Sequence, residues 1–350
     1  MEVTIKDVAK EANVAPSTVS RVIKDSPSIS EGTKKRVREV MERLGYYPNF
    51  QAQSLAGRHT RAIGVIMPNS AFHSFQNPFF SEVLRGIATI ANQQGYGIYL
   101  STSATEDSIY QEVTAMVQGK RVDGILLLYS RKNDQLMSYL NKANVPFTVI
   151  GRPYRKEQQI TYVDNDNIQL STDITNYLLD LGHRRIAFIG GNLEFVVTID
   201  RLKGYEEALS DYGISIDDNL IANHHSIEEK TEDIIQRFMS MQEPPTAIVT
   251  QDDLIAYKIL SHLEALNISV PDDVSIVSIN NHTLSEHSRP PLTSVDIGIV
   301  QLGCEAASCL IEKIEHPETP PKRITIPTNL IIRESSKTIA LEEHKTEQLS

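Results

Sequence analysis

The chain is short of cysteine and of long apolar segments. Among its 350 residues there are two cysteines, Cys304 and Cys309, with neither a CxxC spacing nor an accompanying histidine pair. A zinc site is therefore not expected, and both cysteines are predicted to be packing residues. No apolar run reaches the roughly 18 residues that indicate a membrane span, and residues 1–7 show no signal-peptide core. We therefore expect a cytoplasmic protein without a membrane partner.

Motifs of catalysis are also missing. The sequence contains no GxSxG, no P-loop, no HExxH and no convincing GxGxxG after a strand. The glycine pairs at 190–191 and at 95 and 97 are typical of isolated turns. We predict that the protein is not an enzyme and that it has no catalytic residues, no cofactor and no metal.

Acidic residues outnumber basic ones overall, but not in the amino-terminal segment. The formal net charge is −11, whereas residues 1–61 contain 11 Lys and Arg against 7 Asp and Glu. The remaining residues contain 23 basic against 38 acidic side chains. A basic head on an acidic body suits a phosphate-binding module carried by a soluble domain.

The first two predicted helices of this head are joined by a short turn. Thr4 followed by Asp7 resembles a capping box, and a second helix over 16–23 carries Pro16 in its first turn, where a missing N–H costs little. The outward side chains of this second helix are hydroxyls and an arginine: Ser17, Thr18, Ser20 and Arg21. Such a composition suits contacts with phosphates and base edges, although two short helices can also form an ordinary corner.

A third helix is predicted over 31–44, with Ser30 as its cap. Its apolar residues recur at helical spacing and are expected to pack inward: Val37, Val40, Met41 and Leu44. Its basic residues are expected to face water: Lys34, Lys35, Arg36 and Arg38. This basic run is typical either of a solvated face or of phosphate contact.

From residue 61 the pattern changes to alternating strands and helices. The first apolar strands are predicted at 63–67, 96–100, 124–128 and 147–150, and a helical stretch follows each of them. The alternation then repeats as far as residue 279. It indicates an α/β fold with doubly wound parallel sheets in two successive half-sized lobes. A helix near 300–314 indicates that the chain crosses back to the first lobe.

Four blocks near the amino terminus occur in the order and spacing of a known family. They are residues 4–9 (Thr-Ile-Lys-Asp-Val-Ala), 14–22 (Val-Ala-Pro-Ser-Thr-Val-Ser-Arg-Val), 44–49 (Leu-Gly-Tyr-Tyr-Pro-Asn) and 52–56 (Ala-Gln-Ser-Leu-Ala). The chain thus resembles the LacI/GalR family of bacterial repressors over nearly its whole length. The resemblance implies four regions: a helix-turn-helix DNA-binding domain at 1–48, a hinge helix and linker at 49–60, a two-lobed periplasmic-binding-protein-like body with three crossovers at 61–340, which binds effector and dimerises, and a polar tail at 341–350.

The resemblance also implies where DNA is read. Pro16 and Ser17 match base-reading positions, and Leu55 matches a leucine that wedges between base pairs from the minor groove; a simple buried leucine is the alternative. The implied DNA-binding residues are Thr4, Pro16, Ser17, Thr18, Ser20, Arg21, Tyr47, Asn49, Leu55 and Ala56. Two departures leave the operator preference open. Ala15 stands where a capping Ser is common, and Pro16 stands where bulkier, often polar residues are usual.

Ligands of doubly wound sheets bind at the carboxyl ends of the strands, here between the lobes. The candidate effector-binding residues near those ends are Phe79, Phe80, Arg152, Arg201, His225, Asp252 and Asn280. The resemblance implies that Phe80 stacks on the ligand and that Arg201 holds it. Aromatic faces with Arg, Asp and Asn suit a sugar better than a nucleobase.

Structural alternatives stay open for several of these residues. Asp252 can be a helix cap, His225 can belong to a surface loop, and Arg152 can belong to a surface turn. Asn280 stands where the family often has Asp, and because an amide donates as well as accepts, the ligand contacts can differ.

Two short segments look like the maltose-operon regulators of low-GC Gram-positive bacteria: residues 150–153 (Ile-Gly-Arg-Pro) and 77–80 (Asn-Pro-Phe-Phe). We therefore predict a repressor of a maltose or maltodextrin operon, which a sugar effector releases from a palindromic double-stranded DNA operator. The tail over 342–350 lacks leucine heptads, which favours a homodimer. The alternative is a catabolite-control-type regulator that a phosphorylated carrier protein activates. A transport binding protein would share the body but would need a signal peptide and no DNA head.

Overall fold

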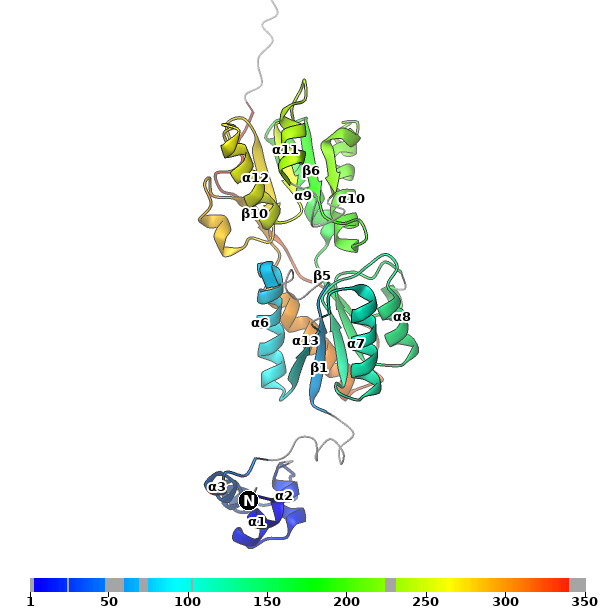
Figure 1. Ribbon diagram of the computed structural model, residues 1–350, viewed down its shortest axis with the longest axis vertical. Coiled ribbons are helices and arrows are strands. Elements are labelled where there is room, and N and C mark those ends of the chain that lie inside the picture. Colours follow the sequence, from blue (N-terminus) through cyan, green and yellow to red (C-terminus); the bar gives the residue numbers. More distant parts are fainter. Residues whose placement is uncertain are drawn as a thin grey trace, which may run out of the picture. The chain divides into compact units, whose positions relative to one another are not determined.

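Figure 1 shows the chain as a computed structural model, which describes residues 3–23, 25–47, 60–68, 75–101, 103–155, 157–223 and 231–339. The chain divides into two units, Met1–Arg61 and Ala62–Ser350. We call the first unit the head and the second unit the body.

Three helices make up the described part of the head: α1 (Ile5–Glu11), α2 (Pro16–Ile23) and α3 (Glu31–Leu44). The predicted interaction at the start of α1 is present, because the backbone N–H and the hydroxyl of Thr4 donate to the Asp7 carboxylate at 2.9 and 2.7 Å. One small apolar core joins the helices, and its buried members are Val8, Ala9, Ala12, Val19, Val22, Val37 and Val40.

Helix α3 departs from its prediction at one basic residue. Ser30 caps it as expected, since its side chain accepts from the Thr33 N–H at 3.4 Å. The prediction that Lys34 faces water is wrong, because the residue is only 5% exposed. Its ammonium lies 3.1 Å from Asp25 and 2.9 Å from Glu31. The head covers the aliphatic stem while the charge meets two exposed carboxylates, a common arrangement for lysine.

The described part of the body contains two six-stranded sheets, one in each lobe. The sheet of the amino-terminal lobe has the order β11-β5-β4-β3-β1-β2, and its pairs are parallel. The sheet of the carboxy-terminal lobe has the order β12-β10-β9-β8-β6-β7, in which β12 runs antiparallel to β10 and the other pairs are parallel. The strands are β1 (Ala62–Ile66), β2 (Gly97–Leu100), β3 (Gly124–Leu127), β4 (Phe147–Ile150), β5 (Tyr162–Asp164), β6 (Ile186–Gly190), β7 (Ile221–Asn223), β8 (Ala247–Thr250), β9 (Ser275–Ile279), β10 (Thr293–Asp296), β11 (Arg323–Thr325) and β12 (Asn329–Ile331).

Helices pack on the faces of both sheets, which confirms the predicted doubly wound architecture. They are α6 (Pro78–Gln93), α7 (Glu106–Gln118), α8 (Gln135–Lys142), α9 (Asn167–Asp180), α10 (Val196–Asp211), α11 (Thr231–Met239), α12 (Asp253–Ala265) and α13 (Ile299–Glu315). The sequence pattern does not predict the short strands β5, β7, β10, β11 and β12. Four of them have only three residues, too few to show a strand period, and β10 (Thr-Ser-Val-Asp) is largely polar.

The chain crosses between the lobes after β5, after β10 and after β11, so three crossovers join them. After β10 the chain returns to the amino-terminal lobe as α13, which lies beside α6 (Figure 1). Gly86 of α6 and Gly303 of α13 let these two helices touch through their backbones. A Cβ on either glycine would stand 2.2 Å from a carbonyl oxygen of the other helix.

Candidate DNA-binding surface and effector cavity

Helix α2 presents the polar side chains that the sequence assigns to DNA. Val19 and Val22 are buried in the core of the head, and this sets the rotation of the helix so that its opposite face points outward. The predicted DNA-binding residues of this helix are exposed or half-buried: Pro16, Ser17, Thr18, Ser20 and Arg21. Hydroxyls and a guanidinium at the surface match the groups that contact phosphates and base edges.

The other residues assigned to DNA lie outside α2. Tyr47, which follows α3, is 88% exposed. Thr4 is also exposed, but its hydroxyl donates to Asp7. Three further residues fall outside the described part of the chain: Asn49, Leu55 and Ala56. The hinge helix and the wedging leucine therefore stay predictions.

A cavity of about 640 Å³ lies between the two lobes of the body. Residues that follow strands of both sheets line it, which is where doubly wound folds bind ligands. Its volume falls in the range of about 300–1,000 Å³ that is typical of small-molecule sites. Five of the predicted effector-binding residues line it: Phe79, Phe80, Arg201, Asp252 and Asn280.

Arg201, on α10, places a buried cation at this cavity. It is 5% exposed. Its Nε donates to Oδ1 of Asn167 at 2.9 Å, and its Nη1 donates to the backbone carbonyl of Gln251. Burial lowers the pKa of Arg201 to about 10, while the carboxylates of Asp252 and Asp164 oppose the shift. The guanidinium stays charged at neutral pH, and with five N–H donors it can bind ligand hydroxyls while it holds these partners.

Asp252 is a helix cap and also part of the cavity wall, while its contact with a ligand stays a prediction. It caps α12 by accepting from the Ile255 N–H at 3.0 Å, and it lines the cavity. Burial raises the pKa of its carboxyl. Asn280 follows β9 with a φ of +112°, a backbone conformation that is rare outside glycine. Because such strain concentrates at binding sites, this conformation supports a ligand-binding role for Asn280.

Phe79 and Phe80 form an aromatic wall in the first turn of α6. Asn77 caps this helix by accepting from the Phe79 N–H at 3.0 Å, and Pro78 begins it. The two rings meet edge to face, with centroids 5.2 Å apart. The ring faces can pack against the C–H groups of a cyclic ligand.

The remaining two effector predictions have different outcomes. Gly151 lines the cavity, but its neighbour Arg152 is not among the described lining residues. The Nη2 and Nε of Arg152 instead donate to the Asp200 carboxylate of the other lobe at 2.6 and 3.1 Å. Arg152 thus forms an inter-lobe ion pair and belongs neither to the cavity wall nor to a surface turn. His225 lies outside the described residues.

Residues just after β5 form a part of the cavity that the sequence reasoning missed. Oδ2 of Asp164 accepts from the Arg152 N–H at 2.7 Å, and Oδ1 accepts from Nδ2 of Asn167 at 3.0 Å. Burial raises the pKa of Asp164 to about 6 against the effect of its backbone hydrogen bonds. A strand of three residues has no recognisable period, so hydrophobic patterning did not reveal β5. The sequence signal that could have revealed this part of the cavity is the alternation of Asp and Asn over 164–167. Other missed lining residues include Tyr129, Phe195, Gln251 and Lys258.

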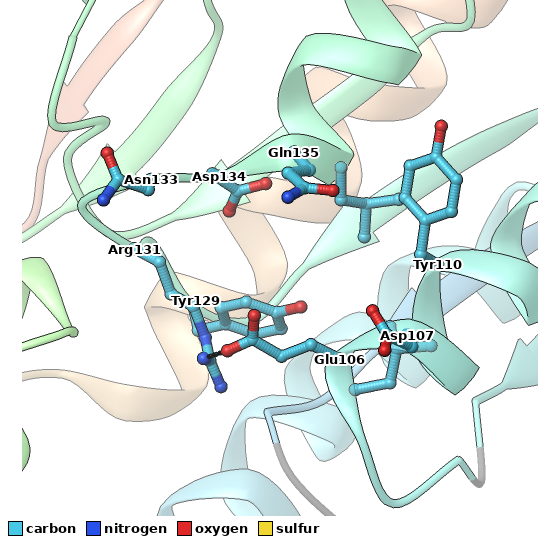
Figure 2. Close-up of a pocket in the computed structure, with 10 residues that line it drawn as sticks. Glu106, Asp107, Tyr110, Tyr129, Arg131, Asn133, Asp134 and Gln135 are labelled. Carbon is cyan, nitrogen blue, oxygen red and sulfur yellow. Dashed lines mark ion pairs between the residues drawn. The ribbon is translucent and has the colours of Figure 1, made fainter.

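Figure 2 shows a second cavity, of about 50 Å³, in the amino-terminal lobe. Arg131 lines it and forms an ion pair with Glu106. The Arg131 guanidinium also lies 4.6 Å from the ring centroid of Phe195 in the other lobe, and the two residues form an antiparallel bridge. Because Tyr129 and Phe195 line the larger cavity, the lobes are in contact at its rim.

Two further findings apply to the described residues. No group of three or more His, Cys, Asp or Glu side chains among them could hold a metal ion. None of their helices is both long and apolar enough to cross a membrane. The cysteines are free thiols on α13, where Cys309 is buried and Cys304 is half-buried.

A helical head with outward hydroxyls and a two-lobed body around a cavity with aromatic and charged residues in its wall define a class of ligand-controlled, DNA-binding regulators. The family profile for bacterial regulatory proteins of the lacI family matches residues 4–49, and that for a periplasmic binding protein-like domain matches residues 175–336. The chain belongs to the lacI family, and it is a DNA-binding transcription regulator and not an enzyme.

Relatives at the level of the whole chain agree with this assignment. The chain is 40% identical to the HTH-type transcriptional regulator MalR of Streptococcus pneumoniae over 303 residues, which are 86% of this chain and 91% of the relative. The crystal structure of a probable maltose operon transcriptional repressor malR from Staphylococcus aureus matches with 31% identity and a TM-score of 0.72, over 79% of this chain and 98% of the other. A complex of the transcriptional regulator CelR with cellobiose matches with 32% identity and a TM-score of 0.75, over 96% and 100%. The predicted family and fold class are confirmed.

Proposed function

We propose that this regulator represses a carbohydrate operon, for maltose or maltodextrin, and that a sugar in the inter-lobe cavity releases it from a palindromic operator. The observation that carries the proposal is the convergence of Arg201, Asp252 and the Phe79–Phe80 pair on one cavity of about 640 Å³. The protein acts in the cytoplasm, where its DNA partner lies.

The chemistry of the cavity wall supports a neutral polyhydroxylated ligand. A guanidinium binds neighbouring hydroxyls through paired donors, and the oxygens of Asp252 and Asn280 can accept hydroxyl hydrogens. The aromatic pair offers ring faces to the C–H groups of a pyranose. Two of the solved relatives also support a sugar as the ligand, since one is described as a probable maltose operon repressor and the other is a complex with cellobiose.

The length of the cavity favours more than one sugar unit. Its lining residues follow four neighbouring strands of one sheet: Pro68 after β1, Tyr129 after β3, Gly151 after β4 and Asp164 at the end of β5. Adjacent strands lie about 4.8 Å apart, so this wall extends over roughly 14 Å from the first to the fourth. That length exceeds one pyranose ring and accommodates a disaccharide such as maltose.

A homodimer is part of the proposal, because a palindromic operator presents two equivalent half-sites. Strand β2 lies at the edge of the amino-terminal sheet. Its residues Ile98 and Tyr99 are 38% and 48% exposed. An edge strand with exposed apolar side chains is a surface on which a second copy can pack.

The proposed mechanism uses the hinge predicted at 49–60. Without sugar, the two bodies hold two hinge segments together, so that both fold as helices and Leu55 of each protomer enters the minor groove. Sugar favours a lobe arrangement that separates the hinges, which then lose their partner. A preference of about 3 kcal/mol for that arrangement is enough to change operator affinity by about a hundredfold.

Fluorescence anisotropy tests the proposal. A labelled palindromic operator from upstream of the neighbouring genes is titrated with the protein, with and without maltose. Cellobiose is the matched control, because it has the same composition and a different linkage. We expect release by maltose and none by cellobiose. Tight binding that ignores maltose and its longer homologues would contradict the maltose assignment. Binding that requires a phosphorylated carrier protein would favour the catabolite-control type.

A further inference from the structure

The three crossovers between the lobes are the segments that any lobe movement has to bend. They cover residues 164–167 after β5, 296–299 after β10 and 325–329 after β11. Rotation of one lobe against the other is absorbed by backbone torsions in such segments. If the crossovers bend independently, movement in one lobe passes poorly to the other. If they are tied together, the lobes turn about one axis.

One side chain joins all three crossovers. Asn165 lies in the first, and its Nδ2 donates to the carbonyl oxygen of Ile297 in the second and to that of Ile326 in the third, both at 3.0 Å. An amide has two N–H donors, so both are used. Asn165 is 6% exposed, and Ile297 and Ile326 are 1% and 2% exposed. Water is therefore kept from these hydrogen bonds.

Backbone hydrogen bonds hold the same place. The Ile326 N–H donates to the backbone carbonyl of Asp164 at 2.8 Å, and the Asn165 N–H donates to the Asp164 carboxylate at 2.8 Å. Removal of the Asn165 amide would leave two buried carbonyl groups without that donor, which is unfavourable. No other residue type of similar size presents two N–H donors from one nitrogen at this length.

The same residues connect to the ligand cavity. Asn165 and Ile297 line it. Oδ1 of Asp164 accepts from the Asn165 N–H and from Nδ2 of Asn167, and Oδ1 of Asn167 accepts from Nε of Arg201. A continuous series of hydrogen bonds thus runs from the guanidinium proposed to hold the sugar to the backbone N–H of Asn165, the residue whose side-chain amide joins the crossovers.

We propose that Asn165 is the pivot of the body: its amide makes the three crossovers turn as one, and so converts occupancy of the cavity into a defined rotation of the amino-terminal lobe. Asn165 is a positioning residue and not the main ligand contact. The inference rests on the proposed function only for the identity of the ligand as a sugar.

The test separates coupling from affinity and from stability. Asn165→Ala removes both donors. Asn165→Ser replaces them with a single O–H donor on a shorter side chain. Asn141→Ala, on the exposed surface of α8, is the matched control. For each protein, calorimetry gives the dissociation constant for maltose, and anisotropy gives the dissociation constant for operator with and without saturating maltose. The ratio of the two operator constants measures the coupling, and thermal unfolding measures stability.

We expect the wild type and Asn141→Ala to have the same coupling ratio. In Asn165→Ala the ratio, measured at saturating maltose, should fall at least tenfold. Saturation removes the influence of any change in maltose affinity, which calorimetry reports separately because Asn165 also lines the cavity. The coupling ratio of Asn165→Ser should lie between that of the wild type and that of Asn165→Ala. If Asn165 had only a structural role, Asn165→Ala would lower the melting temperature and leave the coupling ratio unchanged. A wild-type ratio in both variants would overturn the pivot.

Hydrogen exchange on the wild-type protein covers the case in which the variants do not fold. Peptides over 164–167, 297–299 and 326–328 should change their protection together when operator DNA binds. The pivot would be overturned if operator binding left the protection of all three segments unchanged, or changed it in one segment without the others. This measurement needs no sugar, so a wild-type protein that ignores maltose would count against the proposed function and still leave the pivot tested.

Discussion

Two aspartates of the head and two aspartates at the cavity of the body have opposite pKa shifts. In the head, hydrogen bonds from Thr4 to Asp7 and from Lys34 to Asp25 hold the pKa of each carboxyl below its usual value. In the body, burial raises the pKa of Asp252, and it raises that of Asp164 to about 6. The two carboxylates of the head are exposed beside hydrogen-bond donors, whereas those of the body are desolvated at a cavity.

The two regions also gather their functional residues differently. In the head, one helix of eight residues, α2, carries the main set assigned to DNA. In the body, Asp164, Arg201, Asp252 and Asn280 come from segments far apart in the chain. They meet only because α10 and the carboxyl ends of strands from both sheets border the same cavity. A change in one region should therefore alter one activity and spare the other.

The largest expected effect comes from Arg201→Ala in the body. Loss of the guanidinium removes its hydrogen bond to Asn167 and the charge-assisted hydrogen bonds that we propose it donates to the sugar. Maltose affinity should fall by at least about a hundredfold, which corresponds to about 3 kcal/mol, while operator affinity without sugar stays the same. Calorimetry and anisotropy measure the two quantities. Arg155→Ala, at an exposed position, is the control, and unchanged maltose affinity in Arg201→Ala would remove this residue from the site.

The second effect concerns the pH dependence of stability at Asp164. The pKa of Asp164 is 3.8 in the unfolded chain and about 6 in the folded protein. At a pH between these two values, Asp164 is protonated in the folded protein and ionised in the unfolded chain. The stability that this proton contributes is complete below pH 4 and is lost as the pH rises through 6. The free energy of unfolding of the wild type, minus that of Asp164→Asn, should therefore fall by about 2 kcal/mol between pH 4 and pH 7. Denaturant titrations at each pH give this difference, and a flat profile would show that burial does not perturb this carboxyl.

A smaller effect is expected for Arg21→Ala in the head. Loss of one exposed guanidinium from α2 should weaken operator binding about tenfold, since a single contact to DNA contributes about 1–3 kcal/mol. Maltose affinity should not change. Arg36→Ala on α3 is the matched control, because Arg36 is also exposed. Equal losses in the two variants would mean that α2 has no special role and that general positive charge accounts for binding.

The sequence predicted the functional residues of the head better than those of the body. Helix α2 and its outward residues were predictable, because a helix places them on one face through local geometry alone. Phe80 and Arg201 were predicted from the family resemblance more than from spacing, and both line the cavity. The segment 164–167 was missed, since β5 is too short to show a period. Arg152 was assigned to the ligand, because its place after β4 does not reveal Asp200 across the lobes.

The sequence by itself determined what is local or repeated: the helical head, the alternation of strands and helices, the family and the absence of catalytic motifs. Tertiary structure decided everything that depends on partners distant in the chain. It buried Lys34 beside Asp25, paired Arg152 with Asp200, and brought Asn165 to two carbonyls 132 and 161 residues away. The physical reason is that hydrogen bonds and burial depend on distance in space, whereas sequence patterns report only the neighbours along one helix or strand.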